Sequence, residues 1–353
     1  METALTRELE LHRARVNRGR LALALAALGL AAVALWAVTA GSTAIPLPDI
    51  IAVLQARLFS PGNTDAYSSV LNTIVWDIRL PRVLMAGLTG AALAVAGAAY
   101  QGMFRNPLAD PYLTGVSQGA ALGAVCGFLL PAAFPAALVP VLAFLGAIIS
   151  VGAVYSIART GKTLPVTTLI LGGVAIGAFL ASITSYLIII SGDRVHGIVF
   201  WLLGTFALAD WWRVGIMTPY ILTGATVLLL TARPLNVMQL DEEQAEQLGI
   251  NVERTKIIIL VAATLATAAA VCFCGAIGFV GIIIPHAVRM ICGPDYRLLM
   301  PMSLLGGAAF LILADTAART IMAPAEIPVG IITAIIGAPF FLYLLNQKKK
   351  AVF

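Results

Sequence analysis

The fold of this chain is decided by residues 79–119, which read RLPRVLMAGLTGAALAVAGAAYQGMFRNPLADPYLTGVSQG. The apolar middle of this stretch lies between two arginines, Arg79 and Arg82, and a polar Asn-Pro turn that begins at Asn106. A helix needs about 20 apolar residues to cross roughly 30 Å of hydrocarbon. The stretch therefore predicts one membrane crossing with a polar group at each end.

The composition places the rest of the chain in a bilayer as well. Of its 353 residues 60% are hydrophobic and 11% are charged, and the mean hydropathy is +0.96, whereas soluble domains carry about 25% charged residues. We predict an all-α polytopic membrane protein in which residues 1–353 form a single transmembrane domain. Ten apolar runs are expected to be its helices: 21–40, 82–103, 113–130, 137–158, 165–190, 213–231, 255–273, 278–291, 300–319 and 328–346. The eighth is too short for a simple crossing, so we expect a bend between it and the seventh.

The positive charges predict the orientation. An even number of crossings puts both termini on one side, and positive residues favour the cytoplasm. With cytoplasmic termini, sixteen of the 22 Lys and Arg residues fall inside and six outside. Residues 1–20 are then a cytoplasmic arm. The net charge of +5 is explained by this topology, and we expect no binding of nucleic acid.

One polar insertion of notable length, residues 233–253, is expected on the cytoplasmic side. It predicts a short amphipathic helix with Asp241 as its N-cap and Gly249 as its left-handed C-cap. Leu240 and Leu248 are two turns apart, and Ala245 lies near the same face. A solvated connector is the alternative interpretation of this loop.

We expect that the chain cannot hydrolyse ATP in the way a P-loop subunit does. Gly161-Lys162-Thr163 is similar to the end of a P-loop, but Ser156 stands where that motif needs glycine, and the segment lies between two apolar helices. Cys272-x-Cys274 has the wrong spacing for a zinc site. We therefore expect no enzyme activity, no metal site and no bound cofactor. Energy would come from ATP and Mg on a partner ATPase, or from an ion gradient.

Three segments carry a resemblance to a known family. Arg-Leu-Pro-Arg at 79–82, Arg-Asn-Pro-Leu-Ala-Asp-Pro at 105–111 and Gly-Val-Ser-Gln-Gly-Ala at 115–120 resemble the FecCD-type permease subunits of type II ABC importers for iron complexes and cobalamin. The resemblance implies a homodimer in the bacterial plasma (inner) membrane, joined to two ATP-binding subunits and a periplasmic or lipid-anchored substrate-binding protein. The cargo would be a ferric siderophore, haem or cobalamin.

The resemblance also implies roles for residues. Arginines at the positions of Arg79, Arg82 and Arg319 would receive carboxylates of the binding protein. The cytoplasmic gate would be formed by Asn106, Leu108, Val166 and Thr167, and docking on the ATPase by Leu240, Asp241, Glu242, Glu243, Ala245, Glu246, Leu248 and Gly249. Without the resemblance, the arginines could equally be interfacial and the Asn-Pro segment a plain turn. Asp110 suits a helix cap.

Two other classes of protein compete with this interpretation. An ion-gradient-coupled secondary transporter would place ionisable residues within the membrane, and Asp315 is the best candidate for one. A membrane-embedded enzyme would need clustered catalytic groups, which the sequence does not offer. Nothing in the sequence chooses among the chelates, or assigns transport chemistry to His286, Arg289 or Glu326.

Overall fold

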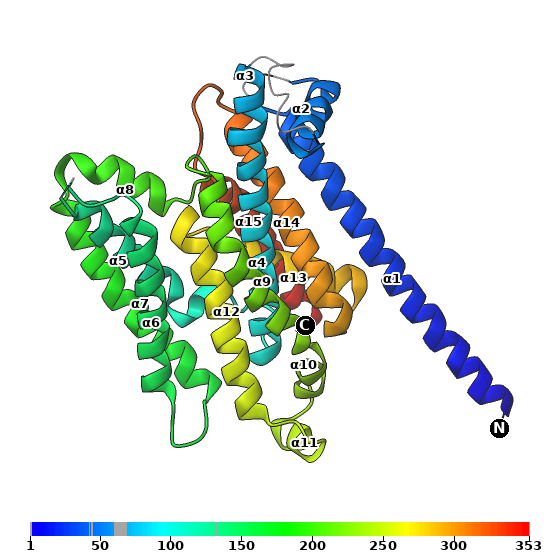
Figure 1. Cartoon of the computed structure of the whole chain (residues 1–353). Coiled ribbons are helices and arrows are strands. Elements are labelled where there is room, and N and C mark those ends of the chain that lie inside the picture. The colour runs from blue at the N-terminus through cyan, green and yellow to red at the C-terminus, as the bar shows by residue number, and fades with distance from the viewer. Residues whose placement is uncertain (1, 42, 44, 60–68, 132, 353) are drawn as a thin grey trace.

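The computed structural model describes residues 2–41, 43, 45–59, 69–131 and 133–352 and shows a bundle of helices (Figure 1). The elements follow in this order: α1 (Glu2–Thr39), α2 (Leu47–Phe59), α3 (Ser69–Asn72), η2 (Thr73–Arg79), α4 (Leu80–Met103), η3 (Pro111–Thr114), α5 (Val116–Leu129), α6 (Leu138–Ala158), α7 (Val166–Ile189), η4 (Gly192–Arg194), α8 (Val195–Leu202), α9 (Trp211–Leu230), α10 (Ala232–Met238), α11 (Glu242–Gln247), α12 (Val252–Cys274), α13 (Val280–Cys292), α14 (Tyr296–Thr320) and α15 (Val329–Val352).

The ten expected spans each correspond to a helix. In the described part of the chain, seven helices are long and apolar enough to cross a membrane: 17–39, 70–103, 138–158, 166–189, 211–230, 252–274 and 296–320. The other three expected spans correspond to shorter apolar helices at 116–129, 280–292 and 329–343. The all-α polytopic fold is confirmed.

The second span begins earlier than the sequence predicts. Helical structure starts at Ser69, before the expected start at residue 82, and passes through the π-helical segment η2. The Leu80 N–H donates to the Val75 carbonyl, five residues back. A wider turn here has a local cause, because Pro81 has no N–H and its ring crowds the preceding turn.

The helix α2 is an element that the sequence analysis missed. It has only thirteen residues, which is too few to cross a bilayer, and no span was expected there. Ile50 and Val53 on one of its faces are buried, and Arg57 Nε donates to Asn72 Oδ1 at 3.1 Å. The helix α2 is therefore amphipathic, and it packs its apolar face against the end of the bundle that carries α3.

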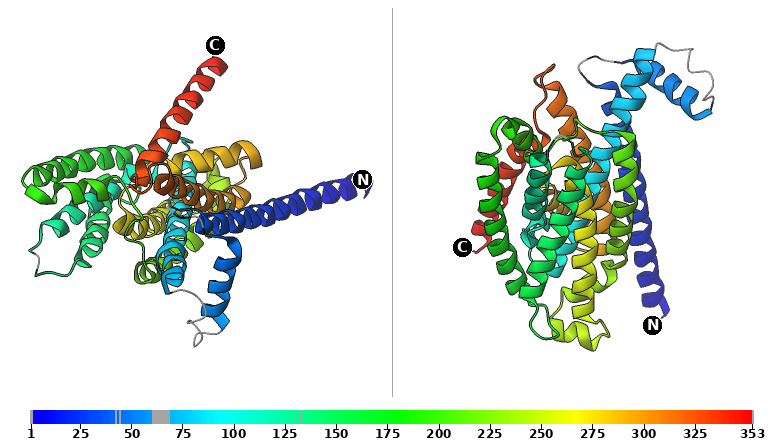
Figure 2. Two further views of the ribbon diagram at one scale, coloured as in Figure 1. Left: turned by 90° about the horizontal axis from the view of Figure 1, so that it is seen from above. Right: turned by 60° about the vertical axis from the view of Figure 1, so that its left-hand side comes forward.

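Two helices, α4 and α12, lie at the centre of the bundle. In their most apolar windows 83% and 78% of the residues are buried, against 11% for α1 and 22% for α7. Seen from above, the ends of α1 and α15 diverge from the bundle (Figure 2). Glycines permit close approach: a Cβ on Gly97 would overlap the Gly281 carbonyl, and one on Gly90 the Gly307 carbonyl. Such contacts replace the hydrophobic driving force that lipid does not supply.

The expected bend between the seventh and eighth spans is present. Residues 275–279 separate α12 from α13 and are not helical, and Gly275 has φ +73°. The Tyr112 hydroxyl bonds both the N–H and the carbonyl of Ile277 at 3.0 Å, and the Thr205 N–H donates to the Cys274 carbonyl at 2.8 Å. Irregular backbone at membrane depth is tolerated where protein satisfies its polar groups in this way.

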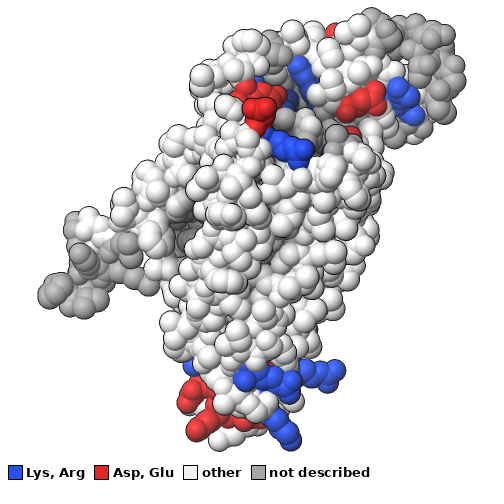
Figure 3. Space-filling model, turned by 90° about the vertical axis from the view of Figure 1, so that its left-hand side faces the viewer, with Lys and Arg blue, Asp and Glu red and all other residues white. Residues whose placement is uncertain are grey.

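Charged side chains gather at the two ends of the bundle, with a broad uncharged band between them on the face that Figure 3 shows. We call these the α2 end, which also carries α8 and the loop between α14 and α15, and the α11 end, which also carries α10 and the loop between α6 and α7 (Figure 1). The polar sites described below lie at these two ends.

Candidate functional site

A buried cluster of charges forms at the α2 end around Arg82, in the first turn of α4. Arg82 Nε donates to Asp315 Oδ2 at 2.9 Å, and Arg82 Nη2 donates to Asp315 Oδ1 at 2.8 Å. Its Nη1 donates to Glu326 Oε1 at 2.8 Å. The Arg82 and Asp315 side chains are 8% and 2% exposed, whereas that of Glu326 is 35% exposed. The planar guanidinium of Arg82 therefore donates hydrogen bonds to two carboxylates, one buried and one at the surface.

The other two predicted docking arginines bind backbone. Arg79 Nη1 donates to the Val38 and Thr39 carbonyls at 2.7 and 2.9 Å, and Arg319 Nη2 donates to the Ala37 carbonyl. These carbonyls end α1, where a helix leaves acceptors unsatisfied and its dipole favours cations. Arg79 and Arg319 thus cap α1 in this state.

The structure brings Arg79, Arg82 and Arg319 together, and all three are buried. Their docking role stays a prediction. Sequence reasoning assigned no role to Glu326 and considered Asp315 mainly as an ion-coupling group. Here Asp315 is an ion-pair partner, and Arg319 Nε, one helical turn further along α14, lies 3.8 Å from its Oδ2. The contact between Arg82 and Glu326 spans 244 residues, and no local pattern could have indicated it.

The loop at the α11 end folds as its caps predict. Asp241 Oδ1 accepts the Glu242 N–H at 2.8 Å, and Gly249 has φ +85°. Leu240 and Leu248 on either side of α11 are 47% and 63% exposed. Two leucines exposed on a small acidic segment form a surface suited to the apolar groove of a partner.

Ala245 and Glu242 lie differently from the prediction. Ala245 is fully buried in a small core with Met238 and Val252, so its methyl group holds the loop together and is not a docking contact. Glu242 was expected to contact the ATPase, but its carboxylate binds Lys256 Nζ at 3.0 Å within the chain. Among the acidic residues of α11, Glu243 and Glu246 are exposed.

The Asn-Pro turn lies against this loop. Asn106 Oδ1 accepts the Leu108 N–H at 3.0 Å, which closes an Asx turn, and Arg105 before it has φ +49°. The Arg105 guanidinium lies 3.8 Å from Asp241 Oδ1 and 3.9 Å from Glu242 Oε1. Asn106 thus fixes the turn, and Arg105 joins it to α11.

The second predicted gate segment begins α7. Pro165 is its N-cap residue, Val166 is half-buried and Thr167 is exposed. Leu164, just before it, is buried, and its N–H donates to Glu253 Oε2 at 2.6 Å. The start of α7 is therefore fixed to the first turn of α12. Asp110 was expected to cap the third helix, but it accepts the Tyr112 N–H at 2.7 Å and caps the short turn η3, and the N-cap of α5 is Gly115.

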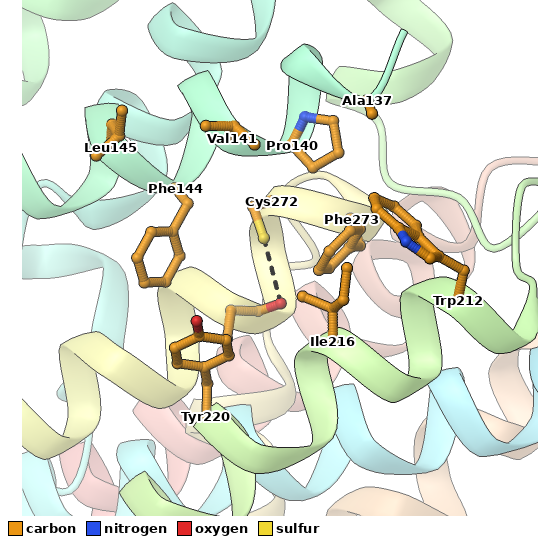
Figure 4. Close-up of a pocket in the computed structure, with 11 residues that line it drawn as sticks. Ala137, Pro140, Val141, Phe144, Leu145, Trp212, Ile216, Tyr220, Cys272 and Phe273 are labelled. Atoms are coloured by element: carbon orange, nitrogen blue, oxygen red, sulfur yellow. Dashed lines mark hydrogen bonds between the residues drawn. The ribbon is translucent and has the colours of Figure 1, made fainter. Parts of the chain in front are cut away.

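An apolar groove of about 300 Å³ lies between α6, α9 and α12, lined by residues that include Phe144, Trp212 and Phe273 (Figure 4). The polar groups in its lining side chains are the Tyr220 hydroxyl, the Trp212 indole N–H and the Cys272 thiol. That thiol donates to the Ala269 carbonyl at 3.4 Å. The groove offers no charged group to a polar cargo, and we assign it no transport role.

Comparison with known proteins agrees with this architecture. Residues 29–347 match the FecCD transport family. The chain is 46% identical, over 89% of its length and 86% of the relative's, to the cobalamin import system permease protein BtuC of Halobacterium salinarum. It is 40% identical, over 78% of its length and 84% of the relative's, to the hemin transport system permease protein HmuU of Yersinia pestis.

A solved structure has the same fold. The chain superposes on an inward-facing conformation of a metal-chelate type ABC transporter with a TM-score of 0.79 and 31% identity, covering 92% of this chain and 98% of that one. Three findings agree: each of the ten predicted spans corresponds to a helix, residues 29–347 match one family, and the fold superposes on a known transporter. The chain belongs to the FecCD transport family of ABC transporter permeases.

Proposed function

We propose that this chain is the membrane-spanning subunit of an ATP-driven importer that moves a metal chelate, namely a ferric siderophore, haem or cobalamin, from a binding protein into the cytoplasm. The observation that carries this proposal is the exposed pair Leu240 and Leu248 on a folded loop joined to the Asn-Pro turn by Arg105. The names of the relatives, which refer to cobalamin and hemin, support the class of cargo.

The proposed mechanism places the energy source outside this chain. ATP binding would draw two partner ATPases together, and each would carry an α11 helix with it. Gate segments at Asn106–Leu108 and Val166–Thr167 would then alternate with an opening at the α2 end. Such a cycle requires the nucleotide to favour one conformation over the other, which it does through the partner. Neither a cofactor nor a metal on this chain takes part.

The oligomer and its orientation follow the same proposal. The α11 end and both termini face the cytoplasm of the inner membrane, as the charge distribution predicts. A second copy of the chain packs beside α7, whose residues Leu171, Val174 and Phe179 are exposed. These exposed apolar side chains could contact either a second copy of the chain or lipid. We favour the second copy, because Val166 at the start of α7 is a proposed gate residue and a gate needs an opposing segment.

Docking of the binding protein is proposed at Arg82. The buried guanidinium of Arg82 already binds two carboxylates, and the one nearer the surface, that of Glu326, is partly exposed. A carboxylate of the binding protein would displace Glu326 and take its place on Arg82 Nη1. Arg79 and Arg319 would join this contact only on releasing the carbonyls that end α1.

Replacing Glu326 therefore has a defined consequence. In the Glu326→Gln variant, the competing charge is gone, and we expect the binding protein to bind about threefold to tenfold more tightly. Titration of the labelled binding protein onto the transporter in nanodiscs measures this. Asp193→Asn is the matched control, because Asp193 is an exposed carboxylate at the same end. Unchanged or weaker binding for Glu326→Gln alone contradicts the exchange.

The function itself is tested by uptake into proteoliposomes that contain this chain with its ATPase and binding protein. We expect labelled ferric siderophore, haem or cobalamin, compared side by side, to accumulate with ATP on the ATPase side and not without it. Accumulation that needs an imposed proton gradient and no ATP overturns the proposal in favour of a secondary transporter.

A further inference from the structure

A buried lysine at the α11 end has no role in the function described so far. Lys256 lies in the first turns of α12, and its side chain is 3% exposed. Its Nζ is 3.0 Å from Glu242 Oε1 on α11 and 2.9 Å from Glu253 Oε1 on its own helix. A buried ammonium is tolerated only where such partners compensate for lost water.

The second of these partners extends the contact to α7. While Glu253 Oε1 binds Lys256, its other oxygen, Oε2, accepts the N–H of Leu164 at 2.6 Å. Leu164 is buried and is followed by Pro165, the N-cap of α7. An unbroken series of short polar contacts therefore runs from Glu242 through Lys256 and Glu253 to Leu164. We call these four residues the Lys256 network.

Glu242 also faces the other predicted gate segment, but more loosely. Its distance to Arg105 is 3.9 Å, and both side chains are substantially exposed, at 45% and 37%. Exposed pairs of this kind contribute little, about 0–1 kcal/mol. The buried route to α7 is therefore the stiffer of the two connections that leave Glu242.

We infer that Lys256 is a positioning residue that makes α11 and the start of α7 move as one body, so that displacement of α11 by the ATPase opens or closes the gate at Val166 and Thr167. The inference rests on the proposed function. It adds a specific connection: without Lys256, the ATPase still binds and turns over, but the α7 gate no longer follows it.

The test separates transport from hydrolysis. In the assembled transporter, we expect Lys256→Met to keep ATPase binding and ATP hydrolysis within about twofold of the parent, while chelate imported per ATP falls about tenfold. Lys256→Arg keeps a cation with several donors and should restore most of that ratio. Arg254→Met is the matched control, because Arg254 is an exposed cation two residues earlier on α12.

A second variant guards against simple misfolding. Glu242→Gln changes a half-exposed group and should lower the same ratio. In the double variant with Lys256→Met, the amount of chelate imported per ATP should be little lower than in Lys256→Met alone, because both substitutions break the same network. Fully additive losses, or an unchanged ratio in Lys256→Met, overturn the inference while leaving ATP-driven uptake by the parent intact.

The coupled motion can be measured directly. Spin labels at the exposed positions Lys162 and Gln247, with the exposed Cys126 replaced by serine, report the distance between the loop before α7 and α11. We expect this distance to stay constant between nucleotide states in the parent and to change in Lys256→Met. A distance that changes equally in both proteins contradicts the inference.

Discussion

Leu248→Asp is expected to abolish ATP-dependent uptake and to weaken binding of the ATPase about a hundredfold or more. Leu248 is 63% exposed and, with Leu240, is one of two exposed leucines on this loop, beside the exposed acidic residues Glu243 and Glu246. Burying a leucine side chain in a partner is worth about 1.5–3 kcal/mol, and a carboxylate in an apolar groove adds a desolvation cost. Co-purification of the ATPase with the variant and the uptake assay measure the two losses.

The adjacent Gln247 provides the control for Leu248→Asp. It is exposed on the same turn, so Gln247→Asp adds the same charge without removing an apolar contact, and it should retain most uptake. Because Leu248 lies outside the small core of Met238, Ala245 and Val252, the melting temperature of the isolated permease should not change. A Leu248→Asp variant that retains its ATPase and transports normally contradicts the docking assignment.

The spans of this fold could be predicted from the sequence because each depends on local composition. Long apolar runs such as 166–189 are separated by Gly, Pro and charged residues, and the bilayer fixes their length. The predicted start at residue 82 was wrong, because the π-helical segment η2 joins α3 to α4 and the helix is already formed before Pro81. The helix α2 was missed because it is shorter than a span.

The site was predictable in proportion to how local its contacts are. The caps of α11 at Asp241 and Gly249 follow from neighbours in the sequence, and both are present. The burial of Ala245 could not be predicted from the amphipathic pattern. In a helix of only six residues, a small side chain can pack equally well against the helix's own loop. The spacing placed Ala245 near the face of Leu240 and Leu248, whereas in the structure it packs against Met238 and Val252.

Contacts between distant segments were beyond the sequence. Arg82 meets Asp315 and Glu326 more than 230 residues away, and Leu164 meets Glu253 across the whole of α7 to α11. Each pairing is set by which helices pack together, not by spacing along the chain. Lys256 shows the consequence: as a positive residue near a membrane end it indicated only orientation, and the fold makes it the buried link between α11 and α7.

Asp315→Ala should be strongly destabilising, because among the described residues Glu326 would be the one carboxylate still paired with the three buried arginines. Removing one partner of a buried ion pair costs about 3–5 kcal/mol, and the melting temperature in detergent should fall by about 10 °C. The exposed carboxylate Asp193 is the control, and Asp193→Ala should change the free energy of unfolding by less than about 0.5 kcal/mol.

Restoring the charge balance separates the structural role of this pair from docking. Arg82→Met combined with Asp315→Leu replaces both charges by apolar groups, which is often neutral for stability, so most of the lost melting temperature should return. The same double variant removes the fork that is proposed to receive the binding protein, and docking should remain weak. If the double variant is as unstable as Asp315→Ala, the loss does not come from unpaired charge. If the double variant is stable and binds the binding protein normally, Arg82 is not the docking residue, because docking would then have survived the loss of the Arg82 guanidinium.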